Sequence, residues 1–92
     1  MSKKKRKVRI GRVLCRPDTK EYLVSYEERH DMGFTQWSDC LENALIFDNV
    51  PEAVSMGWHI VDNCNISIEM YELLENNKLK FEGIAEPLSK RH

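Results

Sequence analysis

Cysteines and histidines are the residues of this chain with the greatest capacity for chemistry, and there are three of each: Cys15, Cys40, Cys64, His30, His59 and His92. Structural zinc sites draw their ligands from close pairs such as C-x2-C, whereas these cysteines lie 25 and 24 positions apart. The spacing therefore predicts no metal site and no cofactor, with the cysteines acting as small core residues. An odd number of widely spaced cysteines also lacks the disulfide framework of a secreted domain, so we expect a reducing, cytoplasmic environment.

One set of residues could in principle support nucleophilic catalysis: Cys40 with His59 and Asp62. A thiol needs a nearby base to become an effective nucleophile, and only a particular fold would bring these three side chains together. Neighbouring carboxylates such as Glu69 and Glu72 are more simply explained as solvated strand positions. Four scattered glycines form no phosphate-binding loop. We therefore predict that the chain is not an enzyme.

Positive charge is concentrated at the N-terminus. Residues 1–12 hold seven basic residues and no acidic one: Lys3, Lys4, Lys5, Arg6, Lys7, Arg9 and Arg12. The first six of these form a candidate nucleic-acid arm, which would bind phosphates with salt-sensitive, sequence-independent affinity. Because the arm has no aromatic residue for base stacking, a solvated tail is an equally good interpretation.

Negative charge follows in the body of the chain. Between Asp18 and Asn77, thirteen acidic residues accompany only Lys20 and Arg29, which gives a net charge of −11. If the expected helix and strands turn these acids outward, they form a negative surface that attracts basic partners and imitates the phosphates of a duplex. The simpler alternative is an acidic surface that only aids solubility. The predicted macromolecule-binding face consists of Glu27, Glu52, Asp62, Glu69, Tyr71 and Glu72.

Two aromatic residues receive opposite assignments. Tyr71 shares a face of its expected strand with Glu69, opposite Ile68 and Met70, so we predict an exposed contact residue. Trp58 falls on the apolar side of the expected helix, which predicts a core position.

A small set of elements must position these residues. Alternation of apolar and polar residues predicts five strands, over residues 8–15, 21–28, 34–37, 66–71 and 78–84, the last of them an edge strand. Turn residues occupy 16–19 and 76–77, and a polar loop is expected over 28–33. Residues 38–43 fit either one helical turn or a bent strand, and 44–47 fit a buried edge of the core.

One helix is expected over residues 51–63. Asp48 and Asn49 offer a capping side chain, and Pro51 stands where the first helical N–H would be unsatisfied in any case. An apolar stripe then runs along one side, where it would cover the sheet, and consists of Ala53, Val54, Gly57, Trp58 and Val61.

These elements predict an α+β fold, a small antiparallel sheet of three to five strands with one helix packed on one face. We expect a disordered basic tail over residues 1–7, a single domain over 8–86 and a flexible C-terminal end over 87–92. The charged fraction is 32% and the longest apolar run, residues 44–47, has four members, so no membrane span is expected.

Two stretches resemble known sequences. Residues 3–8, Lys-Lys-Lys-Arg-Lys-Val, resemble a monopartite nuclear localisation signal of the large T antigen type, which implies a nuclear location if the chain is made in a eukaryotic cell. Residues 20–73 resemble a loose group of small phage-borne proteins through Trp37-Ser38-Asp39, residues 44–47, Pro51-Glu52-Ala53 and residues 66–69. That resemblance implies a β-rich sheet with one covering helix and transfers no catalytic residue.

The expected function is non-enzymatic. Phage proteins of this size often block a host enzyme or defence complex, so we expect an accessory protein that inhibits a host protein or complex through its acidic surface. The alternative is a nucleic-acid-binding module that works through the basic arm. A homodimer is compatible with either function.

Overall fold

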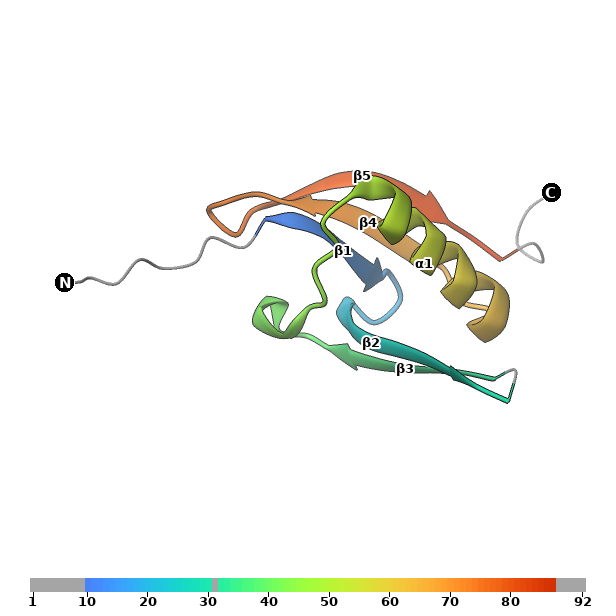
Figure 1. Cartoon of the computed structure of the whole chain (residues 1–92). Coiled ribbons are helices and arrows are strands. Elements are labelled where there is room, and N and C mark those ends of the chain that lie inside the picture. The colour runs from blue at the N-terminus through green and yellow to red at the C-terminus, as the bar shows by residue number, and fades with distance from the viewer. Residues whose placement is uncertain (1–9, 31, 88–92) are drawn as a thin grey trace.

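The computed structural model describes residues 10–30 and 32–87, which form one sheet with a helix packed on it (Figure 1). The sheet order is β3-β2-β1-β4-β5, with every strand antiparallel to its neighbours. The elements are β1 (Gly11–Arg16), β2 (Glu21–Arg29), β3 (Met32–Ser38), the short helix η1 (Leu41–Asn43), α1 (Val50–Cys64), β4 (Ile68–Leu73) and β5 (Leu79–Ala85). The predicted α+β fold class is confirmed.

Two tight turns create the hairpins β1–β2 and β4–β5. In the first, the Lys20 N–H donates to the Arg16 carbonyl at 2.8 Å, and Lys20 has φ of 62°. In the second, Asn77 has φ of 64° and donates to the Leu74 carbonyl at 3.0 Å. Asparagine tolerates this left-handed conformation better than most residues, which explains why the Asn76-Asn77 signal located the turn correctly.

The expected polar loop over residues 28–33 is wrong. β2 continues to Arg29, and β3 begins at Met32, opposite Arg29 in the register. The Tyr26 hydroxyl donates a hydrogen bond to the Glu28 carboxylate, so these polar side chains are paired within β2. The backbone pairing of β2 with β3 continues past them to Arg29 and Met32. The polar residues that indicated a loop therefore belong to the long two-stranded ribbon formed by β2 and β3.

Residues 45–47 fill a gap between β1 and β2. These two strands pair only at Cys15 and Arg16, and beyond that point they separate. Leu45 donates to the Leu23 carbonyl at 2.8 Å, while Arg12 and Phe47 exchange two backbone hydrogen bonds of 2.9 Å. The predicted buried edge is therefore a short connection between two strands. Of the two options for residues 38–43, the structure has the helical turn, η1.

The helix α1 confirms the prediction over residues 51–63. The Asn49 side chain caps it by accepting a hydrogen bond of 2.9 Å from the Glu52 N–H. At the other end Asn65, with φ of 57°, donates to the Val61 carbonyl at 3.0 Å. The helix buries Ala53, Gly57, Ile60 and Val61 in a core with Leu14, Leu23, Phe47 and Ile68.

The assignment of Trp58 to the core is wrong. Its side chain is 37% exposed and Val54 is 40% exposed, whereas Ile60 is fully buried. The buried stripe therefore centres nearer Gly57 and Ile60 than the pattern indicated. Trp58 and Val54 line a groove of about 230 Å³ between α1 and β5.

A second, smaller core lies on the other face of the sheet. Val13, Ala44 and Leu73 are buried there, with Leu41, Ile46 and Leu79 packed around them. Residues 41–46 thus cover one end of this face, and the rest carries no helix. Pro87, expected in the flexible C-terminal end, is buried.

Candidate functional site

The cysteines and histidines within the described ranges are dispersed. Cys40 is exposed just before η1, whereas His59 and Asp62 are exposed on α1, and Figure 1 shows η1 and α1 in different parts of the molecule. Burial raises the thiol pKa of both Cys15 and Cys64, which disfavours the reactive thiolate. No group of three His, Cys, Asp or Glu side chains in residues 10–30 and 32–87 is arranged to hold a metal ion.

The predicted acidic residues do not share one face. Successive side chains of a strand alternate between its two faces, so Glu69 and Tyr71 lie on the face away from α1, whereas Glu72 lies on the helix side. There Glu72 approaches Arg12, with 3.9 Å between its Oε2 and Arg12 Nη2. Arg12 also donates to Glu82, from Nε to Oε1 at 3.0 Å.

The remaining members of the predicted face are scattered. Glu27 pairs with Arg29 at 3.1 Å near the end of the β2–β3 ribbon. Glu52 and Asp62 are exposed in the first and last turns of α1. The prediction of a single continuous face is therefore wrong in its geometry, because it treated strand and helix positions as one surface. The candidate arm, Lys3 to Lys7 and Arg9, lies outside the described residues.

Glu69 and Tyr71 nevertheless belong to a distinct feature, which we call the open-face patch. It consists of the side chains on the sheet face away from α1 that surround Glu69: Tyr22, Glu69, Tyr71, Phe81 and Ile84. The strand register places Cys15 between Tyr22 and Glu69, and Ile84 on the other side of Glu69. The rings of Tyr71 and Phe81 meet edge to face, with centroids 5.6 Å apart.

A β-bulge brings Phe81 and Ile84 to the same face. β4 pairs Tyr71 with Phe81 but Met70 with Gly83, so Glu82 is an extra residue in β5. An extra residue shifts the alternation of side chains by one position. Phe81 is 53% exposed and Ile84 is 52% exposed. The register places both beside the open face, and Ile84, on the edge strand, also borders the groove between α1 and β5. A strict period of two cannot reveal this, which is why sequence reasoning did not include these residues in the site.

One hydrogen bond organises the polar part of the patch. The Tyr71 hydroxyl donates to Glu69 Oε1 at 2.9 Å. This bond, together with burial, raises the pKa of Tyr71 to about 12, so the phenol stays a neutral donor at physiological pH. The bond also orients the Glu69 carboxylate. No basic side chain in the described part of the chain forms an ion pair with Glu69.

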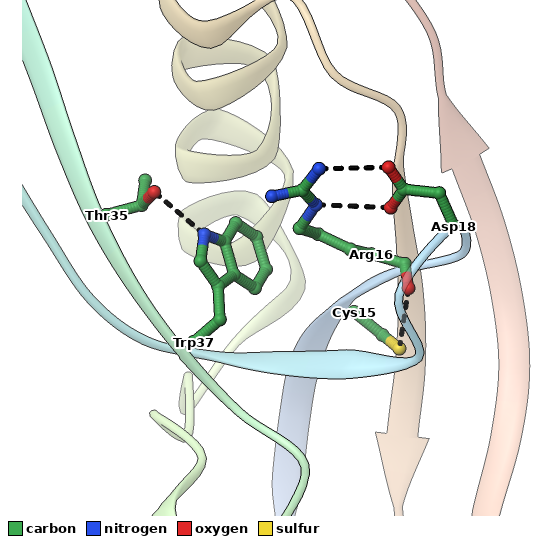
Figure 2. Close-up of polar contacts among 5 residues, drawn as sticks. All are labelled: Cys15, Arg16, Asp18, Thr35 and Trp37. Carbon is green, nitrogen blue, oxygen red and sulfur yellow. Dashed lines mark hydrogen bonds and ion pairs between the residues drawn. The ribbon is translucent and has the colours of Figure 1, made fainter.

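On the helix side of the sheet, a carboxylate, a cation and an aromatic ring lie together (Figure 2). Arg16 donates two hydrogen bonds to Asp18, of 3.1 and 2.9 Å, and its guanidinium carbon lies 5.4 Å from the centre of the Trp37 ring. The indole N–H donates to the Thr35 hydroxyl at 2.7 Å. The hydrogen bonds to Asp18 raise the pKa of Arg16 and lower that of Asp18.

The helix-side arrangement and the open-face patch differ in whether the carboxylate has a cationic partner. On the helix side a carboxylate and an aromatic ring hold a cation between them. On the open face a carboxylate and aromatic rings are present, and no basic side chain of the described residues forms an ion pair with Glu69. The open-face patch is therefore complementary to a positively charged group that also offers apolar surface.

In the portion that the structure describes, no helix has the length and apolar character needed to cross a bilayer. Comparisons of the chain with protein-family models, curated proteins and solved structures find no match.

Proposed function

We propose that this chain is a non-enzymatic binding protein that presents its open-face patch to a basic segment of another protein. The observation that carries the proposal is the carboxylate of Glu69, held by Tyr71 and bordered by Phe81 and Ile84, two of the most exposed large apolar side chains of the chain. Exposed aromatic and aliphatic side chains around a polar group are typical of protein-binding surfaces.

The charge of the patch favours a basic protein over a nucleic acid. An arginine or lysine would pair with Glu69 and lie over the Tyr71 or Phe81 ring, as Arg16 does over Trp37. A phosphate would instead meet a fixed carboxylate and be repelled. The acidic residues elsewhere on the body add a long-range attraction for a basic partner and raise its association rate.

The target that fits this proposal is a host enzyme or defence complex with a basic surface, and the chain would inhibit it by covering that surface. The resemblance of residues 20–73 to small phage-borne proteins supports this choice. A patch of this size would act by occupying a site on the target, which needs no catalytic residue.

The proposal is testable with short peptides as probes. We would titrate the isotope-labelled protein with an Arg-Leu repeat peptide and record amide shifts, with a Glu-Leu repeat as the reverse-charge control. We expect the Arg-Leu peptide to shift the signals of Glu69, Tyr71 and Phe81, and Glu69→Gln to weaken binding about 10-fold. Glu52→Gln, which removes an exposed carboxylate on α1, is the matched control and should lower the affinity much less than Glu69→Gln, because it removes only a long-range attraction.

Two results would overturn this function. Equal shifts with both peptides, or equal losses in Glu69→Gln and Glu52→Gln, would mean that the patch does not recognise positive charge. Binding to labelled duplex DNA or RNA that weakens with salt and disappears on deletion of residues 2–7 would favour the nucleic-acid module instead.

A further inference from the structure

The two edges of the sheet are protected to different degrees. An exposed edge strand offers unpaired backbone groups, and proteins usually guard such edges with charged residues, proline or bulges. β5 has two of these features: the charged residues Lys80 and Glu82, and the bulge at Glu82. β3, with the sequence MGFTQWS, has no charged residue and no proline, and its pairing with β2 is continuous from Gln36 to Met32.

The face of the β2–β3 ribbon away from α1 is apolar and electrically neutral. Met32 is 60% exposed and Phe34 is 48% exposed, and both lie on the ribbon face away from α1. On the neighbouring strand Glu27 and Arg29 neutralise each other at 3.1 Å. In a molecule whose body is otherwise rich in acids, this face of the ribbon is a place where two copies can meet with little repulsion. The remaining acid of its outer half, Glu28, lies on the other face and bonds to Tyr26 and Asn63.

The ribbon is also held in place. Asn63, near the end of α1, donates to the Tyr26 hydroxyl at 2.7 Å and to the Glu28 carboxylate at 2.9 Å. Gly33 of β3 lies close to Asn63 and to the Tyr26 ring, so a Cβ there would lie 3.0 Å from the ring and crowd it. A fixed strand loses little conformational entropy when another strand pairs with it.

We propose that β3 pairs antiparallel with β3 of a second copy of this chain, which would join two five-stranded sheets around a two-fold axis. With the axis at Thr35, the middle residue of β3, Gly33 faces Trp37 of the other copy and Phe34 faces its Gln36. The two-fold axis makes each of these contacts twice.

A second copy fits this edge better than a basic partner strand does. β3 itself is uncharged, so pairing with its own copy buries no charge against Phe34 or Met32. The Glu27 side chains of the two copies would lie on strands about 14 Å apart, three strand spacings, where salt screens most of their repulsion. A lysine or arginine from a foreign strand would instead be desolvated against apolar side chains.

Sedimentation velocity over a range of protein concentrations tests the dimer. We expect a monomer–dimer equilibrium in the wild-type chain, and a weakening of at least 10-fold in Phe34→Lys. Phe81→Lys, a similarly exposed residue on the other edge strand, is the matched control and should dimerise normally. Circular dichroism would establish that both variants are folded. A wild-type chain that stays monomeric, or equal effects of the two substitutions, would overturn the proposal.

Disulfide trapping tests the arrangement itself. In a Cys40→Ser background, which removes the exposed native thiol, Thr35→Cys places two cysteines opposite each other at the axis. Opposed residues of antiparallel strands have Cα atoms about 4.5–5.5 Å apart, within the range of a disulfide. We expect a covalent dimer on mild oxidation, and none for Ser25→Cys, which lies one strand further in. Covalent dimers from both variants, or from neither, would exclude this pairing.

The dimer proposal and the proposed binding function can be tested separately, because the first rests on β3 and the second on β4 and β5. Phe34→Lys should weaken the dimer at least 10-fold and retain binding of the Arg-Leu peptide. Glu69→Gln should weaken binding of the Arg-Leu peptide about 10-fold and retain the dimer.

Discussion

Glu69 and Tyr71 are separated by one residue on β4, so their side chains lie on the same face and a single hydrogen bond of 2.9 Å joins them. Both residues were predicted as contact residues from the sequence. The alternation of β4 correctly placed them on the sheet face opposite Ile68 and Met70, away from α1. It could not show that Tyr71 is half-buried or that its hydroxyl is committed to Glu69, since that depends on side-chain rotamers and on Phe81 from another strand.

The Tyr71 phenol should titrate later than those of Tyr22 and Tyr26. Its pKa is raised to about 12 from an ordinary value of 10.0, chiefly by the bond to Glu69. We expect ultraviolet difference titration to show one tyrosine ionising near pH 12, and Glu69→Gln to lower that pKa because the amide carries no charge. Glu72→Gln, on the opposite face, is the control. An unchanged pKa in Glu69→Gln would contradict the assignment.

The same bond makes a pH-dependent contribution to stability. The folded pKa of Tyr71 lies above the unfolded one, so the contribution is complete below about pH 10 and is lost as pH rises through about 12. At pH 7, Tyr71→Phe should reduce the free energy of unfolding by about 1 kcal/mol, as measured by urea denaturation. A variant as stable as the wild type would mean that the bond contributes nothing net.

At the scale of the element, the helix was the part of the fold most readily predicted. Pro51 and an adjacent capping residue gave a clear start signal, and the structure selects Asn49 over Asp48 as the cap. The stripe was less well predicted, because the sheet's position decides which flank of a helix is buried, and that information is not local. Trp58 is exposed for this reason, whereas Ile60, which the predicted stripe did not include, is buried.

Asn49→Ala should destabilise the chain by about 1 kcal/mol, because it leaves the Glu52 N–H without its acceptor. Thermal unfolding followed by circular dichroism measures the change. Asp48→Ala is the control, since the Asn49 side chain makes the capping bond. If the two substitutions had equal effects, the cap would not be assigned correctly.

Gly57→Ala should stabilise the chain by about 0.5–1 kcal/mol. Alanine has the higher helix propensity, and its Cβ would make ordinary contacts of 3.9 Å with Ile68 and Leu14. Gly11→Ala should have the opposite effect, because Gly11 has φ of 145° and a Cβ there would lie 2.5 Å from the Phe47 carbonyl oxygen. Chemical denaturation of the two variants side by side distinguishes these outcomes.

At the scale of the whole molecule, the fold class and most strands were predictable, whereas the acidic face was not. Charge segregation along a chain does not determine charge segregation on a surface. Glu69 and Glu72 lie on opposite faces because strand positions alternate, and Arg12 neutralises Glu72 from a neighbouring strand 60 residues away in sequence. Both strands of the ribbon were predicted, but its outer end was assigned to a loop over residues 28–33, because the polar residues there imitate one.

Protection from hydrogen exchange should decrease from the centre of the sheet towards the ribbon. β1 is covered on both faces, with Val13, Leu14 and Cys15 all buried, whereas the outer half of the ribbon packs on one face only. In Phe34→Lys, where pairing between copies is removed, we expect β1 amides to exchange slowest and those of residues 26–29 fastest. Equal exchange rates would indicate that the ribbon and the sheet centre open together.

The bulge at Glu82 has a consequence for how subunits could assemble. The residues on either side of Glu82 already face consecutive residues of β4, so deleting one codon would make β5 regular without moving any other pair. The edge at β5 would then be guarded by Lys80 alone. If subunits pair at both edges, they form an open chain that has no natural end. We expect Glu82 deletion to convert closed dimers into filaments visible by electron microscopy, so one extra residue keeps the assembly finite.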